Sequence, residues 1–116
     1  MTEEEAKKLH YELWDWLSHN PSKDKKQWPG FYDEKGNANE LYWMMCYNAF
    51  CFACYIGEQI NMDGGTGSAC RNCPLEREAC LNPRSYYYKW EWGSKTTRSK
   101  YARLIRDSWT REVTPL

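Results

Sequence analysis

The chain has 116 residues, the length of one domain with enough material for a hydrophobic core. Its 16 Lys and Arg residues balance 16 Asp and Glu residues, so the formal net charge is zero. The charges are divided along the chain: residues 1–81 carry 8 basic and 13 acidic residues, a net of -5, and residues 82–116 carry 8 and 3, a net of +5. No apolar run approaches transmembrane length, which excludes a membrane-spanning protein and predicts a soluble one.

The first helix is predicted to begin after Thr2, because Thr2 and Glu5 have the spacing of a capping box. It is predicted to stop near His19, because the following Asn20 and Pro21 are typical of a helix end. Apolar residues recur at helical spacing and predict one face turned to the core. That face comprises Ala6, Leu9, Leu13, Trp16 and Leu17, with His10 and Trp14 at its edge.

Residues 21–39 are polar and rich in turn formers, and they predict an ordered connection rather than a linker. The aromatic residues within 28–32 are expected to attach this connection to the core. Asn39 is a suitable cap for a second helix over residues 40–45. That segment is apolar on nearly all sides, so we expect it to be mostly buried.

Two Cys-x2-Cys pairs follow, Cys51 with Cys54 and Cys70 with Cys73, separated by fifteen residues. This spacing predicts a structural zinc site. A two-residue gap lets one tight turn direct both sulfurs at a single ion, and the second pair completes a tetrahedron of bonds of about 2.3 Å. Four thiolates leave no coordination position for substrate water. The predicted Zn²⁺ is therefore structural, not catalytic.

Six cysteines also suit a disulfide framework, but the N-terminal residues contain no apolar signal-peptide core. A redox pair needs alternating strands and helices around Cys51, and the sequence does not predict them. Cys80 is an alternative ligand in place of one of the four, whereas Cys46 lies in an aromatic run and is expected to be a buried hydrophobic residue. His10 and His19 are weaker candidate ligands than the thiols.

Three helices are predicted after the second pair. Pro74 is suited to open a short helix that ends at Cys80, and residues 86–92 are ambiguous between strand and helix, with helix favoured by the neighbouring segments. The last helix spans about residues 95–109. One of its sides is apolar and the other carries a cationic stripe that is a candidate surface for an acidic partner. The stripe comprises Lys100, Arg103 and Arg106.

Together these elements predict a mainly α fold: a small single domain, residues 1–116, stapled by a zinc site made of two Cys-x2-Cys knuckles. The order of motifs resembles small cysteine-rich zinc-binding proteins encoded by phages and prophages of gut bacteria. One branch of that family is the zinc-containing anti-CRISPR proteins that inhibit type II effector nucleases. The motifs that carry the resemblance are the segment 13–17, Asn20-Pro21, Lys26, Trp28-Pro29, the two cysteine pairs with Pro74-Leu75, Cys80, and Tyr88-Lys89-Trp90.

The resemblance implies a phage-encoded inhibitor in the cytoplasm of a bacterial host. Its partner would be a host type II CRISPR effector nuclease, bound as protein or as guide complex so that target DNA cannot be loaded. The alternative is a phage nucleic-acid-binding zinc protein that uses the basic, aromatic C-terminal third. Zero net charge and an acidic N-terminal two-thirds make direct nucleic-acid binding the weaker hypothesis. No catalytic constellation is evident in the sequence, so we do not expect an enzyme.

Overall fold

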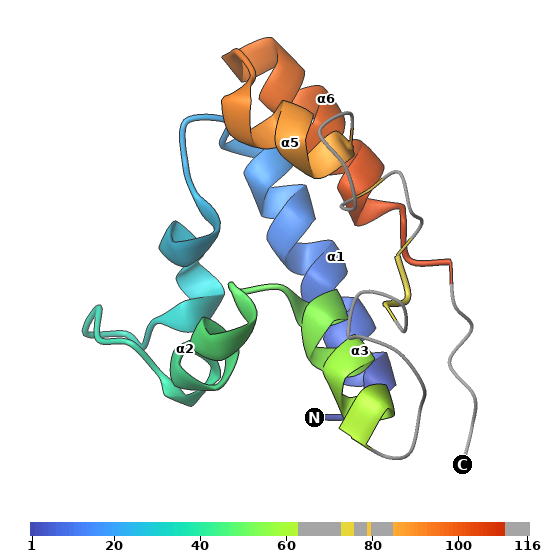
Figure 1. The fold of residues 1–116 in the computed structure, drawn as a ribbon. Helices are drawn as coiled ribbons and strands as arrows, with labels where there is room; N and C mark the ends of the chain where they lie inside the picture. Colours follow the sequence, from blue (N-terminus) through green and yellow to red (C-terminus); the bar gives the residue numbers. More distant parts are fainter. Residues whose placement is uncertain (63–72, 76–78, 80–84, 111–116) are drawn as a thin grey trace.

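The computed structural model describes residues 1–62, 73–75, 79 and 85–110, and within them the fold is mainly helical. Short 3-10 helices lie between the first three α-helices of Figure 1. Two isolated β-bridges join Tyr32 to Ala38 and Leu75 to Trp109. The helices are α1 (Glu3–His19), α2 (Glu40–Met45), α3 (Phe52–Met62), α5 (Tyr86–Trp92) and α6 (Lys95–Arg106), with 3-10 helices η1 (Lys25–Gln27), η2 (Pro29–Phe31) and η3 (Cys46–Asn48).

Helix α1 forms where the sequence predicts it. The Thr2 hydroxyl accepts a hydrogen bond from the backbone N–H of Glu5 at 3.1 Å, and the helix ends at His19. The three acidic residues in its first turn face the partial positive charge of the helix N-terminus, which favours them there. The predicted helix and its cap are both confirmed.

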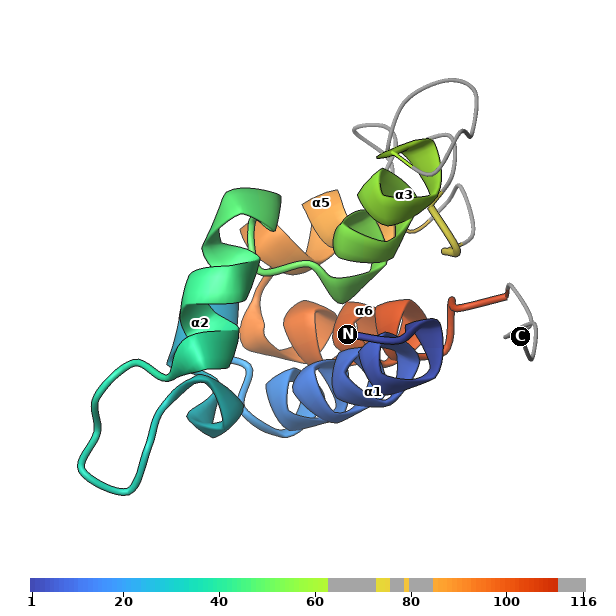
Figure 2. The same cartoon turned by 90° about the horizontal axis from the view of Figure 1, so that it is seen from below.

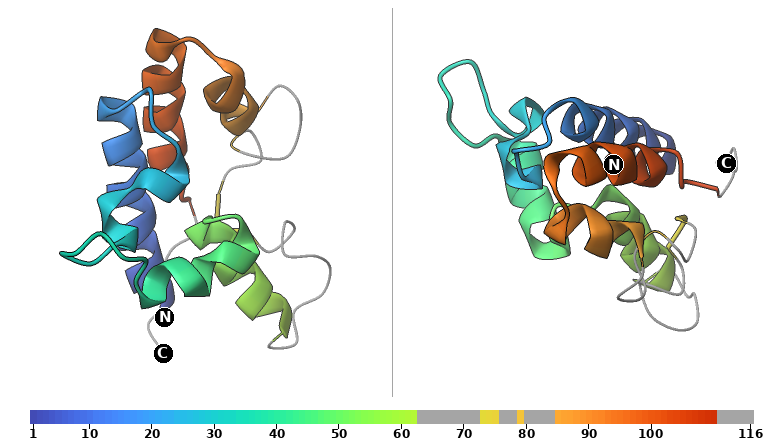
Figure 3. Two further views of the ribbon diagram at one scale, coloured as in Figure 1. Left: turned by 90° about the vertical axis from the view of Figure 1, so that its left-hand side faces the viewer. Right: turned by 90° about the horizontal axis from the view of Figure 1, so that it is seen from above.

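Helices α1 and α6 lie side by side and run in opposite directions (Figure 2). Their contacts show the direction: Ser99 of α6 donates to the Ser18 carbonyl near the end of α1, and His10 reaches Ile105 near the end of α6. In Figures 2 and 3, α3 and α5 cover the same side of this pair, while Figure 1 shows α2 beside the N-terminal half of α1. Helices α5 and α6 pack together as a C-terminal hairpin.

The core is aromatic and lies between these layers. The Trp14 ring packs edge-on against Trp90 of α5 at 4.9 Å between centroids, and Phe31 stacks on Phe52 at 6.0 Å. Such pairs add about 0.5–1.5 kcal/mol each beyond the area they bury. The fully buried large side chains include Leu13, Leu17, Phe31, Met45, Phe52 and Ile105.

The buried stripe of α1 is rotated from the predicted one. His10 and Trp14, expected at the edge, are buried, whereas Leu9 and Trp16, expected at the centre, are only half-buried. The rotation arises because His10 contacts Ile105 of α6 and Trp14 contacts Trp90 of α5, while α3 also packs on α1. Tertiary contacts therefore override the average position of the apolar stripe.

The connection between α1 and α2 is ordered, as predicted for residues 21–39. Trp28 and Phe31 are buried and attach it to the core, with their rings at 5.1 Å in an edge-on arrangement. Asn39 caps α2 as predicted, accepting from the Tyr42 N–H at 3.1 Å. The expectation that α2 is mostly buried is wrong, since Met45 is its only buried residue.

Further along the chain, the helix predicted over residues 86–92 is confirmed as α5, capped by the Ser85 hydroxyl, which accepts from the Tyr88 N–H at 3.2 Å. The last helix ends at Arg106, three residues before Trp109, because Trp109 forms the bridge with Leu75. In the span of the short helix predicted after Pro74, Leu75 is in this bridge and is not helical, whereas Ala79 is helical; residues 76–78 and 80 lie outside the described residues. Among the described helices, none is long and apolar enough to cross a membrane.

Candidate metal centre and binding pocket

The first predicted cysteine pair lies at the start of α3. Cys51 precedes the helix and Cys54 is in its first turn, where the Cys54 backbone N–H donates to the Cys51 sulfur at 3.3 Å. Before them the chain turns sharply, because Ala49 and Phe50 have φ of 52° and 58°, in the left-handed region. The helix therefore begins between the two cysteines, at Phe52.

The surroundings of Cys51 favour its thiolate. A hydrogen bond from the Cys54 side chain is the main influence, and it lowers the pKa of the Cys51 thiol to about 6. Burial opposes this shift, while the nearby Lys25 ammonium and the backbone N–H groups of Ala53 and Cys54 add to it. A thiolate is the form that binds a metal, and hydrogen bonds to its sulfur orient the ligand. The Cys51–Cys54 pair therefore fits half of a thiolate metal site.

The second predicted pair is only partly described. Cys73 is half-buried and packs against the same core cluster as Cys51, and the next residue, Pro74, accepts from the Thr110 N–H at 3.1 Å. Cys70 and the reserve ligand Cys80 lie outside the described residues. Within the described part of the chain, no group of three or more His, Cys, Asp or Glu residues is placed to hold a metal ion. The four-thiolate site remains a prediction.

Cys46 and the two histidines have other surroundings. The Cys46 thiol donates to the Trp43 carbonyl at 3.2 Å and is half-buried, so the expectation of a buried hydrophobic residue is wrong. His10 is 1 % exposed, and its Nε2 lies 2.9 Å from the Ile105 carbonyl, to which it donates. His19 Nδ1 lies 2.8 Å from the Asp15 carbonyl. Burial lowers the pKa of His10 to about 4, so its imidazole is neutral.

The predicted cationic stripe divides into two kinds of residue. Lys100 and Arg103 are exposed, as predicted. Arg106 was also predicted to be exposed, but its side chain is 18 % exposed and donates to Asp15 of α1 at 2.8 Å and to Asp107 at 3.0 Å. Asp107 and Asp15 raise the pKa of this guanidinium, and Arg106 lowers that of Asp107. Arg106 therefore joins α6 to the acidic N-terminal part of the chain.

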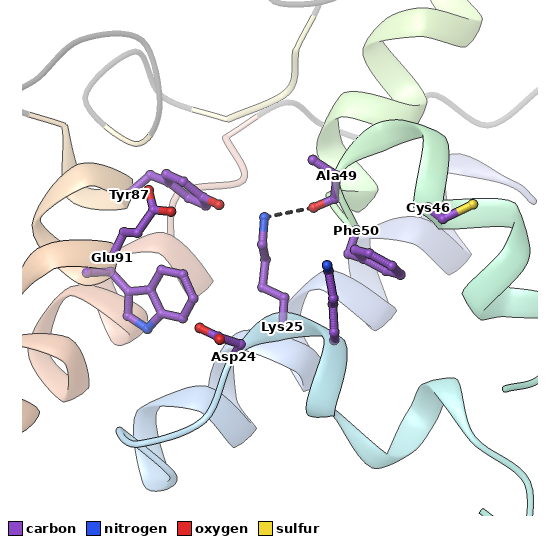
Figure 4. A pocket seen from close by; sticks show the side chains of 9 residues that line it. Asp24, Lys25, Cys46, Ala49, Phe50, Tyr87 and Glu91 are labelled. Carbon is purple, nitrogen blue, oxygen red and sulfur yellow. Dashed lines mark hydrogen bonds between the residues drawn. The ribbon is translucent and has the colours of Figure 1, made fainter. Parts of the chain in front are cut away.

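A pocket of about 460 Å³ opens between η1, the turn before α3, and α5 (Figure 4). Lys25 extends into it and donates to the Ala49 carbonyl at 2.7 Å, with its ammonium 4.5 Å from the centre of the Tyr87 ring. The same lysine therefore supports the left-handed turn that leads to Cys51. Sequence reasoning missed Lys25, because nothing in a polar segment with three nearby lysines distinguishes the buried one.

Large aromatic side chains are exposed on α2, η3 and α5, close in sequence to residues that line this pocket. Trp43 and Tyr47, four residues apart on α2 and η3, are 62 % and 91 % exposed. On α5, Tyr88 and Trp92 are likewise four residues apart, and Trp92 is 72 % exposed. They neighbour the pocket-lining residues in sequence: Cys46 precedes Tyr47, and Tyr87 and Glu91 precede the α5 pair.

In comparisons with known proteins, no family model, no curated protein and no solved structure matches the chain.

Proposed function

We propose that this protein is a phage-encoded inhibitor that binds a host type II CRISPR effector nuclease and prevents loading of target DNA, with Zn²⁺ as a structural ion. Two kinds of support lead to this proposal. The order of cysteine, tryptophan and proline motifs resembles the zinc-containing anti-CRISPR proteins. The exposed aromatic pairs are the feature of the structure that most favours a protein-binding role.

The aromatic pairs carry the proposal because exposed Trp and Tyr are unfavourable without a partner. Trp and Tyr, together with Arg, contribute most of the energy of protein interfaces, and exposed apolar patches mark interaction sites. Here Trp43 on α2 and Tyr47 on η3 are exposed, as are Tyr88 and Trp92 on α5. We call these four residues the aromatic rim. A partner that covers the rim would remove its apolar surface from water.

The charges favour a protein surface over the DNA channel of the effector. An RNA-guided nuclease holds its heteroduplex in a positively charged channel, so a protein that imitates DNA has to be strongly acidic. This chain has zero net charge. We therefore propose contact with a protein lobe that carries acidic and apolar residues, using the aromatic rim with Lys100 and Arg103 as further contacts. Arg106, which we expected to be an anchor, is engaged by Asp15 and Asp107.

The test mixes effector, guide RNA, target DNA and this protein, and measures both binding and cleavage of the target. The protein is expected to abolish cleavage when added before the DNA and to leave the effector intact. The double substitution Tyr47→Ala with Trp92→Ala should weaken inhibition by about tenfold or more, since truncating a central aromatic commonly costs over 1 kcal/mol. Met62→Ala is the matched control, because Met62 is 73 % exposed and lies at the far end of α3.

The nucleic-acid alternative gives a different result in the same assay. Tight binding of this protein to naked DNA, with no effect on several type II effectors, would contradict the proposal and favour the alternative. Retention of full inhibition by the aromatic double variant would place the interface elsewhere on the protein.

A further inference from the structure

We propose that the pocket beside η1 receives a single carboxylate, the side chain of an Asp or Glu residue on a protein partner. This inference rests on the proposed function for its partner, but the chemistry follows from the pocket itself. The pocket has a volume of about 460 Å³, enough for an acidic side chain together with the backbone that carries it. Its walls provide a buried cation, apolar rings and an opening to solvent.

The buried cation is Lys25. This residue is only 9 % exposed, yet no Asp or Glu among the described residues forms an ion pair with it. Its ammonium donates to the Ala49 carbonyl at 2.7 Å and faces the Tyr87 ring, which together engage two of its three N–H groups. A buried charge is costly unless it is paired and hydrogen-bonded. The Cys51 thiol interacts with Lys25 only through space, and a carboxylate in the pocket would supply a counter-charge that is also hydrogen-bonded to the ammonium.

The other residues that line the pocket suit a ligand with one negative charge and not a polyanion. Phe50, Tyr87 and Trp90 provide apolar surface for the methylene groups of an acidic side chain, and the exposed Lys26 adds a second cation at the rim. Asp24 and Glu91 line the same pocket, and Asp24 is already engaged by Arg98 at 3.4 Å. A polyanion such as a nucleic-acid strand would bring repeated charges against these carboxylates. The balance therefore favours an isolated carboxylate on a protein.

The position of the pocket agrees with this assignment. Helix α5 carries both Trp92 and the lining residue Glu91, and η3 carries both Tyr47 and the lining residue Cys46, so a partner bound across these two elements would reach the aromatic rim and the pocket. The central charged contact of an interface gains strength when surrounding apolar residues exclude water. Lys25 is then the polar anchor within an aromatic contact surface.

The first experiment uses small probes and needs no effector. The protein is titrated with the methylamide of N-acetylglutamate, with the corresponding glutamine derivative, and with inorganic phosphate, while NMR follows the signals of Lys25, Ala49 and Tyr87. The glutamate probe is expected to shift these signals to saturation with a dissociation constant on the order of millimolar, as suits so small a ligand. The glutamine probe should have no effect. Equal shifts by both peptides, or saturation by phosphate at lower concentration, would overturn the inference.

Two substitutions, with one control, test whether charge determines binding of the glutamate probe. Lys25→Met removes the ammonium but keeps the aliphatic stem, and should abolish binding of the glutamate probe, whereas Lys100→Met removes an exposed charge elsewhere and should not change it. Glu91→Gln should tighten binding about two- to fivefold, the usual effect of one exposed charge. Glu91 is exposed, so Glu91→Gln is expected to fold. It therefore tests the carboxylate site even if Lys25→Met does not fold. Unchanged or weaker binding by Glu91→Gln contradicts the proposal.

The effector assay then separates this inference from the proposed function. If the protein inhibits an effector and folded Lys25→Met inhibits equally well, the pocket is not the anchor, although the function stands. If the probe binds as expected and no type II effector is inhibited, the carboxylate site stands and the identity of the partner is wrong.

Discussion

The buried histidine of α1 makes folding stability dependent on pH. His10 is 1 % exposed, packs 5.4 Å from the Trp109 ring, and has a pKa lowered to about 4 by burial, against 6.5 in an unfolded chain. Above pH 6.5 the imidazole is neutral in both states and contributes no difference. As the pH falls below 6.5, the His10 imidazole binds a proton in the unfolded chain, whereas in the folded chain it binds one only near pH 4. Stability is therefore lost across this window.

The size of the loss follows from the two pKa values. One unit of pKa difference corresponds to 1.36 kcal/mol, so a difference of 2.5 units gives a full effect of about 3 kcal/mol. Most of it develops early in the window, and between pH 7.5 and 5 the contribution is about 2 kcal/mol. A domain of this size has a net stability of about 5–15 kcal/mol, so the effect is measurable by denaturant titration.

The assay compares wild type with His10→Gln, which keeps a side-chain N–H near the position of Nε2 but does not titrate. Urea unfolding at pH 7.5 and at pH 5 is expected to show a fall in unfolding free energy that is smaller in His10→Gln by about 2 kcal/mol. His19→Gln is the matched control, since His19 is exposed, and it should retain the wild-type fall. Equal pH dependence in wild type and His10→Gln would refute the reasoning.

Two further predictions concern the helices. Arg106→Met should lower the unfolding free energy by about 1–2 kcal/mol, because Asp15 and Asp107 lose a charged donor. Arg103 is exposed, so Arg103→Met should change the unfolding free energy by no more than about 0.5 kcal/mol. Equal effects of the two substitutions in urea titrations would contradict the bridge between α1 and α6. Thr2→Ala should cost about 1 kcal/mol by removing the cap of α1, and Thr2→Ser should restore most of it; an unchanged thermal transition in Thr2→Ala would show that the cap does not contribute.

Local rules predicted the helices well and their burial less well. The ends of α1 and the cap of α2 depend on Thr2 and Asn39, whose side chains act within three residues, so the sequence contains that information. The rotation of the α1 stripe toward Trp14 depends on Trp90, distant in sequence. Helix α2 was expected to be mostly buried, but Trp43 is exposed and only Met45 is fully buried. Apolar periodicity does not identify which neighbouring elements cover a helix.

The candidate site shows the same division. The spacing of Cys51 and Cys54 identified a pair whose sulfur and N–H groups do lie close together, because Cys51 directly precedes the first turn of α3 and Cys54 is in that turn. The role of Arg106 depends on Asp15, which is 91 residues away in the chain, and the role of Lys25 depends on Ala49. Charge patterns along a single helix favoured a binding stripe, and only the packing of α6 on α1 distinguishes Arg106 from Arg103.

The most direct test of the zinc staple is the metal content of the purified protein and its stability after chelation. Structural zinc in small domains contributes an apparent ~10–16 kcal/mol, comparable with the ~5–15 kcal/mol net stability of a whole domain. We therefore expect one zinc ion per chain, loss of most helical circular dichroism when a strong chelator removes it, and poorly soluble Cys51→Ser and Cys73→Ser variants. Protein that contains no stoichiometric metal, or that keeps its thermal transition after chelation, would contradict the account.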